Sequence, residues 1–406
     1  MLTRVNETLV VREKSDGSGS ASELNPSGSP LSPSPSSESE SSIFETRVKR
    51  SPEPKNDLTT LPQEEAQIMS DVEKKVSESA EPWEEVKKTI STRELKKEEA
   101  LKLHQLTEAL PQIYTKVDNP EYDEIYGHRV NVAGLEHVDI EVRNEILLKF
   151  LIAREFDVDK AQKMLIKSLN WRNEFRPLLA AFEETYDDEL NELGVLTYFT
   201  DSDQKDNLKV TTWNLYGNVK NPKKLFEKFG GEENLGTATR PGSQFLRWRV
   251  GLMERATCLL DFTDASNNKG AQVHDYNNVS MFKIDKGMKI ATKEIILIFG
   301  DNYPELLSIK FFLNVNILMS WIFSFFKNLG IISAETLSKF QVSHNSDIGS
   351  YFRPEKLPPQ YNGNRSTLVA SLFDIDYQGS KLSTYGQIIT RKLNEKTIED
   401  VNLTVD

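Results

Sequence analysis

A histidine and a tyrosine, His274 and Tyr276, stand two residues apart in a segment typical of a β-strand. On a strand this spacing places both side chains on one face, with their α-carbons about 6.6 Å apart. A tyrosine phenolate is a hard anionic ligand that suits ferric iron, although its ordinary pKa of about 10 requires the metal or a nearby cation to favour ionisation. Taken alone, the pair is better explained as a buried tyrosine beside a hydrogen-bonded histidine.

The segments around this pair alternate between strand-like and helix-like composition. Strands are predicted where β-branched and aromatic residues are frequent, at 195–199, 209–216, 272–282, 309–315 and 340–342. Helices are predicted at 244–262, 286–299, 317–329 and 346–352. Such alternation indicates βαβ units and therefore an α/β fold with a largely parallel sheet.

A smaller helical region precedes these segments. Ser91 and Glu94 have the spacing of a capping box, which predicts a helix that begins there and ends before Pro111. A second helix is expected to start around Asp139, and Asp157 is expected to cap a third, because apolar residues follow both at helical spacing.

The first 90 residues differ in composition from the rest of the chain. Residues 15–54 are rich in Ser, Pro, Gly and Glu, and residues 55–90 are highly charged and only weakly periodic. Such segments bury too little apolar surface to offset the entropy lost on ordering, so we predict a disordered tail at 1–90. Its Ser-Pro pairs are candidate phosphorylation sites, although we favour a passive tail.

Composition and motifs exclude several classes of protein. The net charge of −12 gives no electrostatic reason to bind nucleic acid, and any contact with a membrane surface is expected to be transient. The single cysteine, Cys258, excludes an intrachain disulfide framework and fits a reducing compartment. We expect neither a secretory signal nor a membrane-spanning segment, because polar residues interrupt the most apolar stretch, 311–326.

Four strings resemble the CRAL-TRIO family and occur in the order that this family shows. They are L-K-F-L-I-A-R-E-F-D-V (148–158), W-R-N-E-F (171–175), N-Y-P-E-L-L (302–307) and K-L-P-P-Q-Y-N-G (356–363). The resemblance implies a helical N-terminal lobe at 91–182 and a ligand-binding lobe at 183–376, followed by a C-terminal extension at 377–406. In this fold a mostly parallel sheet, flanked by helices, floors an apolar pocket that a mobile helix closes as a lid.

The segment 317–329 is the candidate for that lid. It is apolar on nearly every helical face, which by itself favours a core helix. The family resemblance favours instead a gate that covers the pocket and inserts into the membrane interface when it opens.

Four further strings are similar to a haem-holding fungal branch of the phosphatidylinositol transfer proteins in this family. They are T-W-N-L-Y-G (212–217), R-V-G-L-M-E-R (249–255), L-L-D-F-T (259–263) and Q-V-H-D-Y (272–276). This similarity implies ferric haem b as cofactor, with Tyr276 as axial ligand of the iron and His274 as adjacent or alternative ligand. It implies that Arg249 and Lys293 are cationic partners of the propionates or of the phenolate. Without this similarity, both residues would be interpreted as solvated charges on helices.

The general family also implies a lipid-headgroup set. Matching positions here are Arg154, Glu305, Thr336 and Lys339. Glu155 replaces a second basic residue, and its carboxylate would repel a phosphate. Ordinary surface ion pairing explains these residues equally well.

These resemblances together imply a non-enzymatic haem b-binding, phosphatidylinositol-transfer-like protein. It would act as a ligand carrier or sensor in lipid or phosphoinositide homeostasis or in the oxidant stress response. We expect it in the cytoplasm, peripherally associated with the endoplasmic reticulum or other internal membranes. The alternatives are a plain phosphatidylinositol exchanger without haem and, less favoured, a haem peroxidase, because no acid–base groups for O–O cleavage are identifiable and His274 shares the face of the ligand. The sequence gives no signal of oligomeric state.

Overall fold

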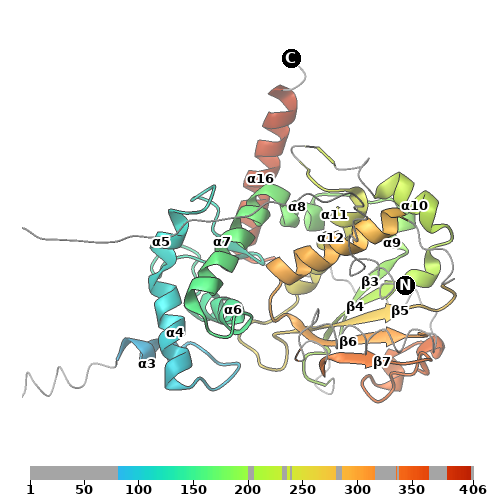
Figure 1. The fold of residues 1–406 in the computed structure, drawn as a ribbon, viewed down its shortest axis with the longest axis horizontal. Coiled ribbons are helices and arrows are strands. Elements are labelled where there is room, and N and C mark those ends of the chain that lie inside the picture. The colour runs from blue at the N-terminus through green and yellow to red at the C-terminus, as the bar shows by residue number, and fades with distance from the viewer. Residues whose placement is uncertain are drawn as a thin grey trace, which may run out of the picture. The chain divides into compact units, whose positions relative to one another are not determined.

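The structure, a computed structural model, describes residues 81–199, 205–230, 236–237, 240–279, 286–315, 335, 338–364 and 382–403. The described residues belong to one unit, in which a helical lobe adjoins an α/β lobe (Figure 1). Within these ranges, no helix has both the length and the apolar character needed to cross a bilayer. The tail up to residue 80 and the candidate lid at 317–329 lie outside the described residues.

The helical lobe is built from helices with apolar residues at helical spacing. They are α3 (Pro82–Lys88), α4 (Lys97–Glu108), α5 (Leu110–Tyr114), α6 (Ile140–Ile152), α7 (Val158–Phe175) and α8 (Pro177–Phe182). Between α5 and α6 the chain forms a short antiparallel pair, β1 (Glu124–Ile125) and β2 (His128–Arg129). Asp139 and Asp157 begin α6 and α7 as predicted, since each carboxylate accepts a hydrogen bond from an amide of the first helical turn.

The start of the helical lobe differs from the prediction. Helix α3 lies within the segment that we assigned to the tail, and its Trp83 and Val86 pack against the core of the lobe. The predicted capping box is also wrong, because α4 begins at Lys97, where the Glu99 carboxylate accepts a bond from the Lys96 amide at 3.0 Å. Ser91 instead donates its amide N–H to Glu145 of α6 at 2.9 Å, a tertiary contact that local spacing could not reveal.

The α/β lobe contains a five-stranded sheet with the order β3-β4-β5-β6-β7. The strands are β3 (Gly194–Tyr198), β4 (Val210–Leu215), β5 (Gly270–Asp275), β6 (Leu307–Leu313) and β7 (Phe340–Val342). β3 pairs with β4 in the antiparallel direction, and the other neighbours are parallel. The predicted, largely parallel sheet is therefore confirmed.

Strand β5 is shorter than the predicted strand at 272–282. Asp275 ends it, because its Oδ1 accepts a hydrogen bond from the Asn277 amide at 2.8 Å and Asn278 then adopts a left-handed backbone conformation with φ 61°. Tyr276 remains tied to the sheet, since its amide donates to the Leu313 carbonyl at 3.0 Å.

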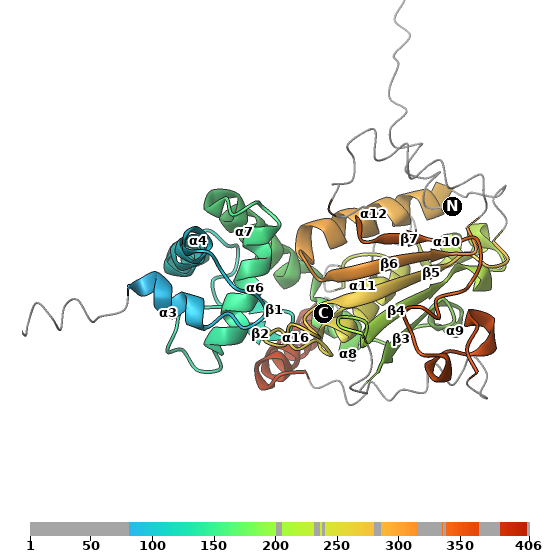
Figure 2. The ribbon, with the colours of Figure 1, turned by 90° about the horizontal axis from the view of Figure 1, so that it is seen from below.

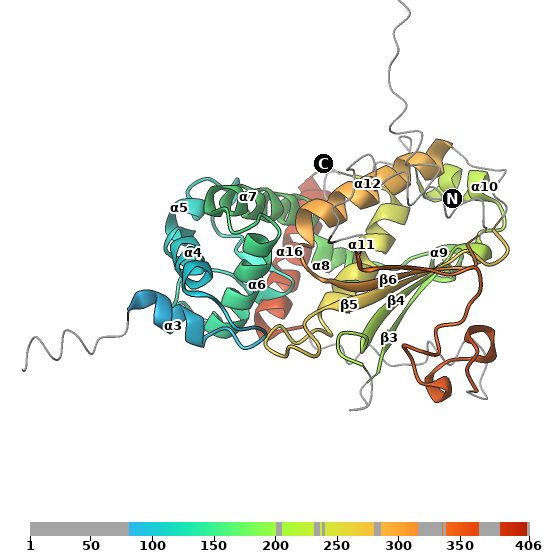
Figure 3. The same ribbon diagram turned by 60° about the horizontal axis from the view of Figure 1, so that its bottom comes forward.

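Helices cover one face of the sheet. The α/β lobe contains α9 (Asp188–Asn191), α10 (Pro222–Phe229), α11 (Gln244–Thr257) and α12 (Lys286–Asn302), with a 3₁₀ turn, η1 (Tyr216–Asn218), after β4. Figure 2 and Figure 3 show α11 and α12 on one side of the sheet and the chain that follows β7 on the other. Side chains of β4, β5 and β6 consequently alternate between a helix-covered face and a face covered by loops.

The loop-covered face has its own apolar core. Trp213, Val273 and Phe311 point to it and pack with Phe352 and Tyr361. Two 3₁₀ turns, η3 (Pro354–Lys356) and η4 (Pro359–Tyr361), lie in this covering segment. The predicted helix at 346–352 does not form, because the side chains of residues 345 and 347 bind the amides two positions later and so stabilise turns.

A buried ionic network joins the helical lobe to α11. Arg172 of α7 lies between two carboxylates, with its Nη2 2.8 Å from Glu124 Oε1 and its Nη1 2.7 Å from Glu254 Oε1. Tyr303, just after α12, donates its hydroxyl to the same Glu254 oxygen at 2.5 Å. The three charged side chains are fully buried, so this network fixes where α11 lies relative to the helical lobe.

The C-terminal extension contains one described helix, α16 (Thr384–Leu403). Its first half packs on α8 through Tyr385, Ile389 and Leu393, and the Tyr385 hydroxyl donates a hydrogen bond to Asp123. The extension is therefore integrated into the helical lobe.

Candidate ligand-binding site

Two rows of side chains cross the sheet on the face that α11 and α12 cover. Strand register places Thr212, Gln272 and Lys310 in one row, and Asn214, His274 and Phe312 in the next. Tyr216 and Tyr276 follow at the carboxyl ends of β4 and β5, and Arg249 approaches from α11. We call Tyr216, Arg249, His274, Tyr276 and Lys310 the buried cluster, in which Arg249, His274 and Tyr276 are buried and Tyr216 and Lys310 are half-buried.

His274 is held by hydrogen bonds at both ring nitrogens. Its Nδ1 lies 2.9 Å from the Tyr216 hydroxyl, and its Nε2 lies 3.4 Å from Gln272 Oε1. Because the Gln272 oxygen only accepts, Nε2 carries the proton and Nδ1 accepts from Tyr216. Burial, together with Lys310 and Arg249, lowers the pKa of His274 well below its usual value, so the imidazole is neutral at neutral pH.

Tyr276 is buried among aromatic rings without a partner for its hydroxyl. Its ring centroid lies 5.1 Å from that of Tyr216 and 6.5 Å from that of Phe312. Within the described part of the chain, its Oη has no hydrogen-bond partner. Burial and the nearby Tyr216 raise its pKa well above the usual value, so the phenol is neutral. His274, which we expected beside it as partner, is bonded to Tyr216 instead.

Arg249 brings a positive charge to the helix-covered side of the site. Its side chain is 4% exposed, and its guanidinium carbon lies 5.3 Å from the centre of the Phe299 ring. Its Nη1 has no hydrogen-bond partner among the described residues. Burial lowers its pKa, which means that the charged form is poorly compensated.

Lys293, the second cation implied by the family resemblance, lies elsewhere. It is on α12, but its side chain is exposed to solvent. No ion pair or hydrogen bond joins it to Tyr276 or Arg249 in the ranges that the structure describes. The structure therefore brings Arg249, but not Lys293, into the buried cluster.

Sequence reasoning missed Tyr216 and Lys310. Tyr216 lies in the string 212–217 that carried the resemblance, but only the pairing of β4 with β5 shows that it reaches His274. Lys310 is a single lysine within an apolar strand, two residues before Phe312, and this period-two spacing is the signal that could have found it. Burial, and secondly Arg249, lower its pKa to about 7.

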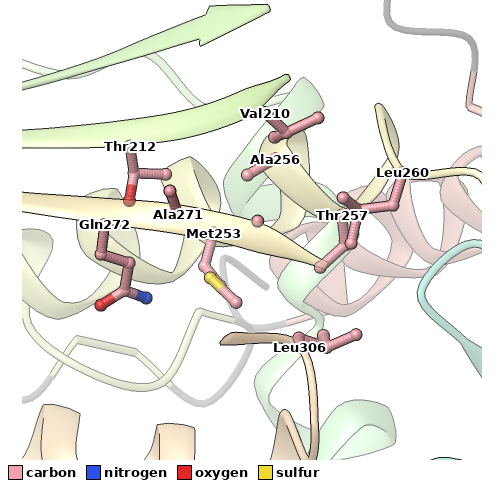
Figure 4. A pocket seen from close by; sticks show the side chains of 10 residues that line it. Val210, Thr212, Met253, Ala256, Thr257, Leu260, Ala271, Gln272 and Leu306 are labelled. Atoms are coloured by element: carbon pink, nitrogen blue, oxygen red, sulfur yellow. The ribbon is translucent and has the colours of Figure 1, made fainter. Parts of the chain in front are cut away.

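A small apolar cavity lies between the sheet and α11, beside Gln272. It has a volume of about 20 Å³, enough for about one water molecule. Thr212 and Gln272 line it from the sheet, and Met253 and Ala256 line it from α11 (Figure 4). The hydroxyl of Thr212 is buried and has no hydrogen-bond partner in the described ranges.

The residues predicted to bind a lipid headgroup are only partly brought together. Glu305 and Lys339 form an ion pair with a distance of 3.2 Å. Arg154 lies in the turn after α6, where its Nη1 donates to the Ala153 carbonyl at 2.9 Å. It makes no contact with Glu305 or Lys339 in the described part of the chain. Thr336 lies outside the described residues.

Two lysines that the sequence analysis did not single out lie beside this ion pair. Lys149 of α6 is buried and donates to the Asn268 carbonyl at 3.0 Å and to the Glu305 carbonyl at 3.3 Å. Burial, followed by the charge of Lys269, lowers its pKa to about 7. Lys149, Lys269 and Lys339 thus gather around Glu305 at the junction of the two lobes. The described residues contain no cluster of three or more His, Cys, Asp or Glu side chains able to hold a metal ion.

The fold and site define a member of the CRAL-TRIO family. The family profile described as "CRAL/TRIO domain" matches residues 208–363, and "CRAL/TRIO, N-terminal domain" matches residues 82–167. The chain belongs to this family, and the CRAL-TRIO fold that the sequence predicted is confirmed.

Within the family, the chain is similar to fungal proteins named "Phosphatidylinositol transfer protein SFH5". It is 56% identical to that of Candida albicans over 324 residues, which cover 80% of this chain and 98% of the relative. It is also 56% identical to that of Scheffersomyces stipitis over 326 residues, with coverages of 80% and 97%. A crystal structure of Sfh5 matches with a TM-score of 0.64 at 31% identity, covering 75% of this chain and 99% of that one.

Proposed function

We propose that this protein is a non-enzymatic carrier that holds phosphatidylinositol between its sheet and helices α11 and α12 and exchanges it at membrane surfaces. The names of its relatives support this class of ligand. The observation that carries the proposal is Arg249, a buried cation whose Nη1 lacks a partner among the described residues. A phosphate of a lipid would supply charge-assisted hydrogen bonds to this guanidinium.

Ligand entry requires the site to open. The cavity of about 20 Å³ accommodates about one water, far less than an acyl chain. A bound lipid would therefore need more space between the sheet and α11 than these lining residues leave. Apolar rings, together with a cation such as Arg249 whose Nη1 has no partner among the described residues, are the surroundings that an amphipathic anion needs.

Ferric haem b is a second candidate ligand, and the hydroxyl of Tyr276 favours it. This oxygen is buried and has no hydrogen-bond partner within the described ranges. A side chain that binds a metal is expected to lack a partner in this way when the metal is not bound. Tyr276 would hold the iron, and Arg249 would pair with a propionate or stabilise the phenolate. The rings of Tyr216 and Phe312 beside it suit a planar ligand. Bound haem would add a redox-active iron to the site.

His274 would influence that iron indirectly in this arrangement. Its Nδ1 is engaged by Tyr216, and its Nε2 faces Gln272. It would therefore shape the surroundings of the phenolate rather than bind the metal while these bonds persist. Lys293, which is exposed, would contribute only a distant charge.

A carrier of this class works at membrane surfaces, so we infer a cytoplasmic protein with peripheral association to the endoplasmic reticulum or other internal membranes. Fractionation of cells that express the full chain tests this location. Release of the protein from the membrane fraction by salt or carbonate is expected, whereas release only by detergent would contradict peripheral association.

The lipid proposal is tested by transfer between vesicles with the purified full chain. Wild-type protein is expected to move phosphatidylinositol from donor to acceptor vesicles, and Arg249→Met is expected to slow transfer about tenfold or more, because a charged hydrogen bond to the ligand is lost. Arg353→Met is the matched control, since Arg353 pairs on the surface with Glu355 at 3.2 Å. A wild-type protein that neither carries nor transfers phospholipid would refute the proposal.

The haem proposal is tested by the absorption spectrum of the same preparation. A Soret band with a ferric charge-transfer feature is expected if haem is bound, and Tyr276→Phe should abolish or alter it. His274→Ala should shift the spectrum less. A colourless protein that carries phospholipid would leave the lipid function and exclude haem.

A further inference from the structure

Lys310 is a positive charge on the floor of the site that the proposed ligands do not yet account for. It lies on β6 in register with Gln272 of β5, which in turn pairs with Thr212 of β4. Its ammonium lies 5.5 Å from the ring centre of Phe312, two residues further along the strand. Lys310 therefore shares the helix-covered face with His274 and Tyr276.

The charges around Lys310 are not balanced. Arg249 acts on it from α11, and His274 beside it is neutral. Among the described residues, no carboxylate forms an ion pair with Lys310 or Arg249. Two positive charges in one partly dehydrated space repel each other, and an anion placed between them would remove both the repulsion and part of the desolvation cost.

Lys149, which is buried, and Lys339, which is half-buried, show what a purely structural lysine looks like here. Lys339 is paired with Glu305 and with Glu335, each at 3.2 Å. Lys149 donates to two backbone carbonyls. Lys310 differs from both, because its ammonium forms no ion pair or hydrogen bond with the described residues, and the oxygen of its neighbour Gln272 is directed to His274.

Unused hydrogen-bond donors on the same face also point to a missing acceptor. Arg249 Nη1 and Thr212 Oγ1 are buried, and neither has a partner within the ranges described. Thr212 occupies the opposite end of the row that contains Lys310. Buried donors without acceptors are rare in folded proteins, so their presence around one pair of cations indicates a place for a ligand oxygen.

We propose that Lys310 and Arg249 form an oxyanion-binding site on the helix-covered face of the sheet and make the protein select ligands with a net negative head over zwitterionic or neutral ones. This inference rests on the proposed carrier function. The oxyanion is either the phosphate of an anionic phospholipid or a carboxylate of a haem propionate. Lys310 is a specificity-determining residue in both cases, because it contacts the charged end of the ligand.

The test compares the full-length wild type with Lys310→Met, Lys310→Arg and Lys223→Met. Methionine preserves the stem of the side chain and removes its charge, whereas arginine retains the charge. Lys223 is 72% exposed on α10, so its replacement by methionine controls for the loss of one positive charge. Thermal melting of each ligand-free variant verifies folding, and Lys310→Gln replaces Lys310→Met if the latter does not fold.

The lipid arm measures binding from vesicles that contain phosphatidylinositol or phosphatidylcholine. Lys310→Met is expected to lower the preference for phosphatidylinositol about tenfold or more, while Lys310→Arg and Lys223→Met keep it. The haem arm compares haemin with haemin dimethyl ester, in which the propionate charges are absent. Lys310→Met is expected to weaken haemin binding to a similar degree without changing the binding of the ester.

The two arms identify the source of the oxyanion, because the ligand whose binding changes in Lys310→Met is the one that carries it. If Lys310→Met shows the wild-type preference in both arms while the wild type binds either ligand, the oxyanion site is refuted and the carrier function stands. If the wild type binds neither phosphatidylinositol nor haemin, the proposed function itself fails.

Discussion

Replacing Tyr276 by phenylalanine is expected to stabilise the ligand-free protein. The side chain is 5% exposed, and its hydroxyl has no hydrogen-bond partner in the described part of the chain. Burying a hydroxyl without a partner costs about 1–3 kcal/mol, and the substitution removes only this oxygen. The ring keeps its contacts with Tyr216 and Phe312. The free energy of unfolding should therefore rise by about 1–3 kcal/mol.

Tyr303→Phe is the matched control, because the same atom is removed from a hydroxyl that has a partner. Tyr303 is also buried, but it donates to the Glu254 carboxylate at 2.5 Å. Hydrogen bonds to charged groups contribute about 1.5–3 kcal/mol, so this substitution should lower the free energy of unfolding by a similar amount. The two tyrosine-to-phenylalanine changes are thus expected to have opposite signs.

The assay is urea unfolding of the ligand-free full chain, followed by far-ultraviolet circular dichroism. Protein is first extracted so that neither lipid nor haem is retained, because a ligand that binds only the folded state would raise apparent stability. Equal m-values among the wild type and both variants allow the midpoints to be compared directly as free energies.

The reasoning about the site depends on the sign of the Tyr276→Phe effect. A loss of stability comparable to that of Tyr303→Phe would show that the Tyr276 hydroxyl is already satisfied in the ligand-free protein. An already satisfied hydroxyl would give no support for a contact between Tyr276 and a ligand atom. A gain in stability that coincides with loss of ligand binding would show that the hydroxyl is retained for binding at a cost in stability.

Three further predictions concern other parts of the molecule. Arg172→Met leaves two buried carboxylates without their partner and should lower the free energy of unfolding by about 3–5 kcal/mol in urea titration; wild-type stability would contradict a role for this network. Lys310 has a folded-state pKa of about 7, below the ordinary lysine value near 10.5, so its burial opposes folding most at low pH and ligand-free stability should rise between about pH 7 and 10. In Lys310→Met this contribution should vanish, and an unchanged pH slope would contradict it. Deleting residues 1–80 should leave the melting temperature and ligand binding unchanged, whereas deleting residues 1–90 removes α3 and should lower the melting temperature.

Local sequence signals predicted the elements whose formation depends on neighbouring residues. Helices were predicted to start around Asp139 and at the cap Asp157, and in both a short acceptor directly before an apolar periodic segment satisfies the first amides of the helix. The five strands of the sheet were found from their β-branched and aromatic composition. The family landmarks added the order of the lobes, which the profile matches confirm.

Predictions failed where a distant residue competes with the local signal. Ser91 has the spacing of a helix cap, but its amide N–H donates a hydrogen bond to Glu145 of α6. The helix begins instead at Lys97. A short helix was predicted at 346–352, but the side chains of Asn345 and Asp347 bind backbone amides two positions later and favour turns. Trp83 lies in a polar region that composition assigns to the tail, although its ring packs on the helical core.

The candidate site shows the same division. Period two along one strand is a property of the sequence, and it was enough to place His274 and Tyr276 on the same face of the sheet. Which atoms surround them depends on the register between strands that are far apart in the chain, and on the packing of α11. Only the tertiary structure could therefore show that His274 bonds to Tyr216, that the Tyr276 hydroxyl has no partner among the described residues, and that Arg249 acts electrostatically on Lys310. The sequence determined the residue types and their spacing, and the pairing of the strands decided which of them meet.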